Sequence, residues 1–83
     1  MTTAEEVRSE IVRHVVATTR GRVPAERLAD DTNLVAQGFL DSIGFVGLIA
    51  ALEEKFGVEL DLVEKPIEEF IVLGSLVKQV LGN

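Results

Sequence analysis

The chain has 83 residues, which is enough for one small domain with a single core. It has no cysteine and only one histidine, which excludes disulfides, a thiolate metal site, a protein thiol nucleophile and a histidine-rich metal site, so no metal ligands are predicted. The net charge is −6, and the charges are unevenly distributed along the chain. Residues 1–27 contain five arginines and four glutamates, whereas the rest of the chain contains three lysines and ten acidic residues. This balance argues against nucleic acid and favours partner proteins with basic surfaces, although solubility alone would also explain it.

The first expected element is a helix from residue 4 to residue 18 or 19. Thr3 and Glu6 fit a capping box at its start. Its apolar residues recur at helical spacing: Val7, Ile11, Val12, Val15 and Val16. The charged residues between them are expected to face solvent: Arg8, Glu10 and Arg13. We interpret His14 as a surface or boundary residue and not as a catalytic base.

A long connection of low periodicity follows, over residues 20–41. Connections of this length in compact domains are typically functional or contain a short element of their own. Pro24 suits the first position of one helical turn over residues 24–28, and residues 30–33 have turn composition. Three apolar residues are spaced to fix the connection to a core: Val23, Leu28 and Leu34.

The second main helix is expected over residues 42–56, with Asp41 as its cap and Gly57 as its stop. Its expected core stripe consists of Ile43, Val46, Ile49 or Ala50, Leu52 and Phe56. Glu53, Glu54 and Lys55 form a solvated end. Residues 58–60 alternate like a strand but are interpreted as an extended connector, because the chain contains no second strand to pair with them.

Two further helices are expected, a short one over residues 66–70 with Ile67 and Phe70 inward, and a final one over residues 73–81. The predicted fold class is therefore all-α, a four-helix bundle of three main helices and one short helix in a single domain over residues 1–83. The longest nearly apolar stretch, 45–52, is too short to cross a bilayer, and the acidic N-terminus is unlike a signal segment. We expect a cytoplasmic protein.

Ser42 is the first candidate for a chemical site. A hydroxyl at a helix N-terminus lies where unpaired backbone N–H groups and the positive end of the helix dipole favour an attached phosphate. An Asp-Ser pair at a helix start is, taken alone, most often a plain cap. The surrounding residues decide between the two interpretations.

The run Gly38-Phe39-Leu40-Asp41-Ser42-Ile43, followed by Val46, Leu48, Leu52-Glu53-Glu54, Phe56 and Leu60, resembles the acyl carrier protein family over essentially the whole chain. In that family a Gly-x-x-Asp-Ser-Leu segment opens the second helix of a four-helix bundle. The resemblance implies that Ser42 carries 4′-phosphopantetheine from coenzyme A, whose thiol holds an acyl or aminoacyl group as a thioester. It further implies that Asp41 caps the helix and contacts the modifying enzyme.

The resemblance also implies a carrier on which partner enzymes act, and not an enzyme, which agrees with the absence of a visible catalytic base in the sequence. We expect the carrier to be a monomer. The implied partners are a phosphopantetheinyl transferase and the enzymes that load and unload the thiol, with no nucleic acid and no membrane. Glu53 and Glu54 resemble acidic partner-facing positions of the second carrier helix, although a solvated helix end explains them equally well.

Two glycines depart from the pattern of fatty-acid carriers. Gly44 and Gly47 stand where many of those carriers have acids, and each glycine costs about 0.8–1 kcal/mol relative to alanine inside a helix. Tolerated drift or close packing of this helix on a neighbour would explain them. The functional hypothesis is that Gly44, Phe45 and Gly47 give a flatter, less acidic face to a dedicated partner. Ile43 is also counted among the residues expected to contact that partner.

The run from Asp41 to Val46 also looks closer to stand-alone carriers, including D-alanyl carriers and the discrete carriers of specialised, polyketide or nonribosomal-type biosynthesis. It lacks the double-glycine-serine pattern of many peptidyl carriers and the arginine-rich segment common in modular polyketide carriers. The alternative function is a helical docking or adaptor module that keeps the fold without the cofactor. A serine hydrolase would need a base, an orienting acid and an oxyanion hole in one pocket, which one histidine and this small scaffold do not offer.

Overall fold

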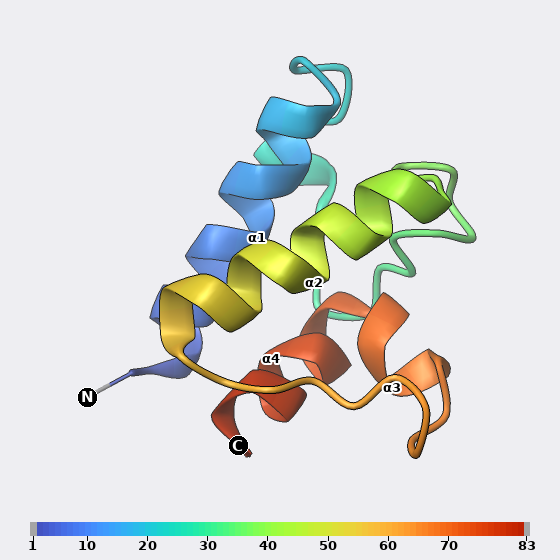
Figure 1. Cartoon of the computed structure of the whole chain (residues 1–83). Coiled ribbons are helices and arrows are strands. Elements are labelled where there is room, and N and C mark those ends of the chain that lie inside the picture. Colours follow the sequence, from blue (N-terminus) through green and yellow to red (C-terminus); the bar gives the residue numbers. More distant parts are fainter. Residues whose placement is uncertain (1, 83) are drawn as a thin grey trace.

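The computed structural model describes residues 2–82, so Met1 and Asn83 lie outside the described residues. The elements are α1 (Ala4–Thr18), the 3₁₀ turn η1 (Ala25–Arg27), α2 (Ser42–Phe56), α3 (Glu68–Ile71) and α4 (Leu73–Leu81). α1 packs against α2 and α4, and α3 packs against α4 (Figure 1). Over residues 2–82 the chain forms no strand beyond an isolated bridge between Asn33 and Val72. The predicted all-α bundle with a long first loop is confirmed.

The ends of the two long helices follow local sequence signals. At the start of α1 the Thr3 hydroxyl accepts a hydrogen bond from the Glu6 amide at 3.2 Å, and the Glu6 carboxylate accepts from the Thr3 amide at 3.3 Å. α2 begins after Asp41 and ends at Gly57, whose φ of 64° suits the left-handed cap position that glycine tolerates best. The capping box, the α2 cap and both predicted helix ranges are confirmed.

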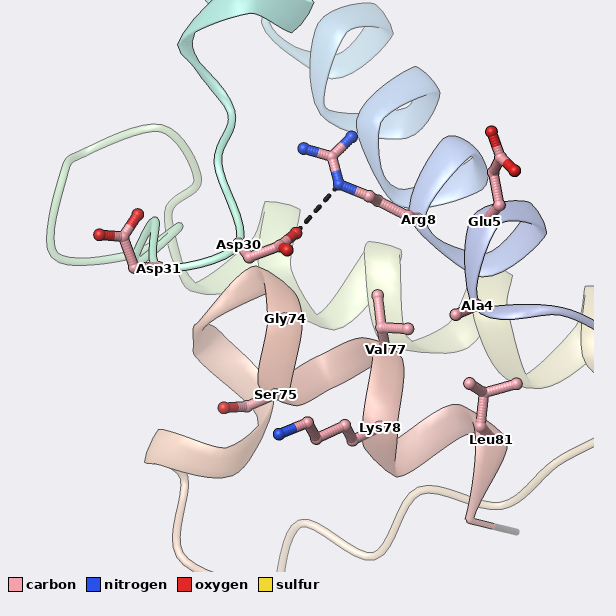
Figure 2. A pocket seen from close by; sticks show the side chains of 10 residues that line it. All are labelled: Ala4, Glu5, Arg8, Asp30, Asp31, Gly74, Ser75, Val77, Lys78 and Leu81. Atoms are coloured by element: carbon pink, nitrogen blue, oxygen red, sulfur yellow. Dashed lines mark hydrogen bonds and ion pairs between the residues drawn. The ribbon is translucent and has the colours of Figure 1, made fainter.

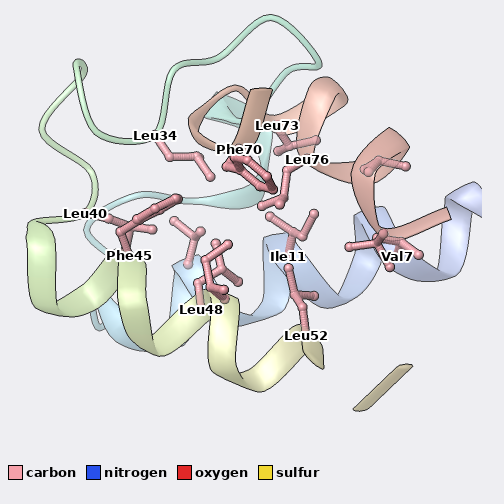
Figure 3. Close-up of a cluster of buried hydrophobic side chains, with 14 of the residues drawn as sticks. Val7, Ile11, Leu34, Leu40, Phe45, Leu48, Leu52, Phe70, Leu73 and Leu76 are labelled. Atoms are coloured by element: carbon pink, nitrogen blue, oxygen red, sulfur yellow. The ribbon is translucent and has the colours of Figure 1, made fainter. Parts of the chain in front are cut away.

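A single apolar core joins all the helices and the long loop (Figure 3). Its fully buried large side chains are Phe70, Ile11, Leu34, Leu48, Leu52, Leu73, Leu76, Val7 and Val15. The loop residues Val23, Leu28 and Leu34 are buried, as predicted, so the long connection is fixed to the bundle. The segment 58–60 is a connector outside any helix or strand, as predicted, and Leu60 contributes to the core.

The predicted core stripe of α2 is wrong for its first two members. Ile43 is 84% exposed and Val46 is 59% exposed, whereas the buried residues of the helix are Phe45, Leu48, Ile49 and Leu52. The physical reason is that α2 is apolar around most of its circumference, so two stripes with spacings of three and four residues are equally regular. Packing against α1 and α4 selects one of them.

Glu10 was expected to face solvent, and this prediction is also wrong. The residue is buried, and its carboxylate accepts hydrogen bonds from Arg13 and lies 3.7 Å from Lys55 Nζ. These two cations satisfy the buried charge. Because Lys55 belongs to the last turn of α2, the contact ties the middle of α1 to the C-terminal end of α2.

The short helix differs from its prediction in two respects. α3 begins at Glu68, two residues later than predicted, because the amides of Glu69 and Phe70 bond back to Pro66 and Ile67 in a preceding turn. Phe70 is fully buried, as expected, but Ile67 is 46% exposed and does not point inward. In a helix of about one turn, one apolar anchor is enough to fix the packing.

Candidate functional site

The start of α2 is held by a loop whose own backbone is fixed to the core. The Leu34 amide donates to the Ile71 carbonyl at 2.7 Å, and the Leu40 amide donates to the Leu34 carbonyl at 2.9 Å. Both leucine side chains are buried. The Asn33 side chain accepts from the amides of Val35 and Ala36, which closes the intervening turn. The candidate site therefore sits on a positioned segment.

Gly38 and Asp41 set the direction in which the chain enters α2. Gly38 has a φ of 76°, which favours glycine, and its amide donates to the Val35 carbonyl at 2.9 Å. Asp41 is extended, and its Oδ1 accepts from the Gly44 amide at 2.7 Å, so it caps the helix as predicted. The Phe45 amide bonds to the Asp41 carbonyl at 2.8 Å.

Ser42 is the first residue of α2 and is exposed. Its hydroxyl has no hydrogen-bond partner within residues 2–82, and the same holds for the backbone amides of Ser42 and Ile43. The first turn of α2 contains no acidic residue. The free hydroxyl, two unpaired N–H donors and the helix dipole together suit a phosphate ester on Ser42 Oγ. The residues present fit the attachment of a phosphate-linked group.

The predicted partner-facing residues divide into three groups. Ile43, Gly47 and Glu54 are exposed, and Gly44 is half-buried. Phe45 is 6% exposed and packs in the core, so the prediction that it faces a partner is wrong. At roughly 100° of rotation per residue, Phe45 points at least about 100° away from its exposed neighbours Ile43 and Gly47.

Glu53 is half-buried and has a structural role that the sequence did not reveal. Its Oε2 accepts a hydrogen bond from the Leu60 amide at 2.9 Å, so it holds the connector after α2 against the helix. The prediction of a fully solvated end is wrong at this residue. Glu54, its neighbour, is exposed as expected and is the acidic residue of the pair that remains accessible to a partner.

The two glycines of α2 differ in their surroundings. A Cβ at Gly44 would lie 3.2 Å from Asp41 Oδ1 and 3.4 Å from Leu40 Cδ2, so a side chain there would crowd the helix cap. A Cβ at Gly47 would meet nothing within 4 Å. Close packing on a neighbouring helix, one of the explanations considered for both glycines, therefore does not apply to Gly47.

Sequence reasoning missed that Val46 and Ala50 belong to the exposed side of α2. Together with Ile43 and Gly47 they make an exposed apolar stripe at positions i, i+3, i+4 and i+7, which we call the apolar face of α2. The spacing itself was the available signal, because it repeats the periodicity of the buried stripe. The face begins one residue after Ser42.

One sizeable cavity has no lining residue at or next to Ser42. It has a volume of about 680 Å³ and is lined by the first turns of α1, by α4 and by the loop at Asp30 and Asp31 (Figure 2). Arg8 donates to Asp30 at 3.0 Å across one side of it. No residue of α2 lines this cavity, so it is not part of the candidate site.

His14 and possible metal ligands are the other candidates for chemistry among residues 2–82. The single histidine, His14, lies in α1 and is half-buried, as predicted for a boundary residue. Burial, followed by the charge of Arg13, lowers the pKa of His14. The same described residues contain no cluster of three or more His, Cys, Asp or Glu side chains that could hold a metal ion, and no helix long and apolar enough to cross a membrane.

Comparisons with known proteins point to one protein family. Residues 10–65 match the protein family described as the phosphopantetheine attachment site. Two acyl carrier proteins of Helicobacter pylori, from strains G27 and 26695, are 36% and 38% identical to this chain over 61 residues. The match covers 74% of this chain and 76% of each relative. No solved structure matches the chain significantly.

Proposed function

The chain belongs to the acyl carrier protein family, which carries covalently attached 4′-phosphopantetheine, and we propose that Ser42 Oγ is the attachment atom in this member. The observation that supports the proposal most directly is the environment of the hydroxyl. It is exposed, it has no partner within residues 2–82, and it stands beside two unpaired backbone amides. Ser75 also lies in the first turn of a helix, α4, but no Gly-x-x-Asp segment precedes it as one precedes Ser42.

The attachment reaction needs little from the chain itself. A transferase would form the bond between Ser42 Oγ and the phosphorus of coenzyme A while the diphosphate bond breaks, and the nucleotide part of coenzyme A would leave. The serine proton passes to the transferase or to solvent. Asp41 keeps the first turn of α2 in place, and the amides of Ser42 and Ile43 offset the charge of the phosphodiester. Once bound, the cofactor supplies the thiol on which cargo is held as a thioester.

The partner enzymes of this carrier are proposed to contact the apolar face of α2. Ile43 and Val46 leave most of their apolar surface in water, although burying such a side chain is worth about 1.5–3 kcal/mol. Exposed apolar surface beside a functional residue is typical of a protein interaction site. Glu54 places a negative charge at the far end of the same helix, where it can orient a basic partner.

We assign the carrier to specialised biosynthesis of the polyketide or nonribosomal type, or to a D-alanyl-type system, and expect a small acyl or aminoacyl cargo. The support is the apolar face itself. Many fatty-acid carriers have an acid where this chain has Gly47 on that face, so its partners would recognise shape and apolar contact more than negative charge. The corresponding partners are a phosphopantetheinyl transferase and enzymes that load and unload the thiol.

Intact-mass measurement after co-expression with a broad-specificity phosphopantetheinyl transferase tests the attachment. We expect wild type to gain one phosphopantetheine group and Ser42→Ala to gain none. Ser75→Ala is the matched control, because it removes another hydroxyl from the first turn of a helix, and it should be modified like wild type. An unmodified wild type would favour the adaptor alternative. Modification of Ser42→Ala would place the cofactor elsewhere.

A further inference from the structure

A second, smaller cavity lies directly beside the start of α2. Its volume is about 190 Å³. It is lined by Thr18 at the end of α1, by Thr19 and Arg22 just after it, by the segment 38–41, and by Gly44. Two of its lining residues are close to Ser42 in the sequence: Asp41 directly precedes it and Gly44 follows it by two residues, while Ser42 itself is not part of the lining. We call it the α1–α2 pocket.

The wall of this pocket on the α1 side is fixed by hydrogen bonds. Thr19 is buried, and its hydroxyl donates to the Val15 carbonyl at 2.8 Å and accepts from the Val23 amide at 3.3 Å. The Arg22 Nε donates to the Thr19 carbonyl at 3.3 Å. This hydrogen bond holds the Nε end of the Arg22 guanidinium against the pocket wall.

Four arginines of the described residues have side-chain contacts, and Arg22 is the one of these four whose contact is with neither a carboxylate nor an aromatic ring. Arg8 pairs with Asp30, Arg13 pairs with Glu10, and Arg27 lies 5.2 Å above the ring of Phe39. The terminal nitrogens of Arg22 have no partner within residues 2–82. A guanidinium with free donors at a polar pocket suits phosphate oxygens, which match its fork geometry.

Gly44 keeps the pocket open. A side chain at this position would begin 3.2 Å from Asp41 Oδ1 and 3.4 Å from Leu40 Cδ2, and both of these residues line the pocket. An acid at residue 44 would also add a negative charge facing Arg22. The glycine therefore leaves both the space and the positive charge available. The pocket also contains one negative charge, the carboxylate of Asp41, whose Oδ1 accepts the hydrogen bond from the Gly44 amide.

We propose that the α1–α2 pocket receives the phosphate end of the arm attached to Ser42, with Arg22 pairing with the phosphodiester. This inference rests on the proposed attachment at Ser42. The cavity of about 190 Å³ is small for a whole phosphopantetheine, so it accommodates the phosphate and the next few atoms only. The base of the arm then leans toward α1, and the apolar face of α2 stays free for partner enzymes.

Amide chemical shifts of the ¹⁵N-labelled chain, recorded before and after modification, test the proposal. Intact mass first establishes that the arm is present. We expect shifts at Thr18, Thr19 and Arg22 in addition to residues 41–45, and a nuclear Overhauser contact between the geminal methyl groups of the arm and the Thr18 methyl. In Arg22→Gln the shifts at the two threonines should fall to less than about half, because the guanidinium–phosphate pair is lost.

Arg20→Gln is the matched control, since it removes an arginine from the same end of α1 that does not line the pocket. Its threonine shifts should equal those of wild type. A modified protein whose shifts are confined to residues 41–45, or whose threonine shifts survive Arg22→Gln unchanged, would overturn the pocket while leaving attachment at Ser42 intact. Absence of the mass gain would overturn the attachment itself.

Discussion

The two sides of α2 are both apolar, but one is buried and the other is exposed to solvent. One side places Phe45, Leu48, Ile49 and Leu52 in the core, and the other exposes Ile43, Val46, Gly47 and Ala50 to solvent. Both sides are apolar and both follow helical spacing. The difference teaches that apolar periodicity in this helix describes two surfaces, one that holds the fold together and one that is available for a partner.

The largest expected effect is on stability and separates the two sides directly. Leu48→Ala removes a fully buried side chain and should lower the free energy of unfolding by about 2–5 kcal/mol, because it leaves a cavity. Val46→Ala on the apolar face should change it by less than about 0.5 kcal/mol. Urea unfolding followed by circular dichroism measures both. Equal losses would contradict the assignment of the two sides.

The second prediction concerns binding at the apolar face. Val46→Glu should lower kcat/KM for modification by a phosphopantetheinyl transferase about tenfold, which corresponds to roughly 1.4 kcal/mol, while stability stays near that of wild type. The rate of phosphopantetheine incorporation, followed by intact mass, gives this value. Gly47→Glu should act in the same direction, because Gly47 is open to solvent on the same face.

Ser9→Glu is the control for these two variants, since it adds the same charge at an exposed position of α1. Its modification kinetics should match those of wild type. If it slows modification as much as Val46→Glu, the effect is one of net charge and the apolar face has no special role.

The third prediction concerns the cap at the N-terminus of α2. Asp41→Ala removes the hydrogen bond to the Gly44 amide and should cost about 1 kcal/mol of stability, as measured by urea unfolding. Asp41→Asn keeps an acceptor and should recover most of the loss. Loss of modification in Asp41→Asn with normal stability would point to recognition of the charge by the transferase.

The smallest expected effect is a pH dependence of stability from Glu10 of α1, which contacts Lys55 at the C-terminal end of α2. The hydrogen bond from Arg13, then the charges of Arg13 and Lys55, lower the pKa of Glu10 against the opposing effect of burial. A lowered folded-state pKa stabilises the protein above the usual value of 4.5 and loses that contribution as the pH falls through the folded-state value.

Glu10→Gln should therefore flatten the acid limb of stability against pH. Below about pH 4.5 the difference between wild type and variant should shrink, and above it wild type should be more stable by roughly 0.5–1 kcal/mol. Urea unfolding at a series of pH values measures this difference. A constant difference across the series would exclude titration of Glu10 as its source.

Much of the local structure could be predicted because its causes are local. The Thr3–Glu6 capping box, the Asp41 cap and the Gly57 stop each depend on side chains within a few residues of the helix end. The position of Ser42 at the start of α2 follows from the same signals. The family resemblance was likewise carried by residues close together in the sequence.

The errors concern residues whose surroundings come from distant parts of the chain. Val46 was predicted only inward and Phe45 toward a partner, whereas packing against α1 and α4 reverses both. Ile43 was predicted in the core stripe and also toward a partner, and its exposure excludes the first of these predictions. Glu10 is buried because Lys55 arrives from another helix, and Glu53 is held because Leu60 folds back onto it. Sequence spacing alone contains none of these contacts.

By itself, the sequence determined the helices, their ends, the all-α class and the serine at the start of the second helix. These follow from hydrogen bonds and periodicities that span a few residues. Only the tertiary structure decided which side of α2 is buried, because an almost uniformly apolar helix can bury either side. It also brought Arg22 beside Gly44, through a loop whose burial depends on the whole core.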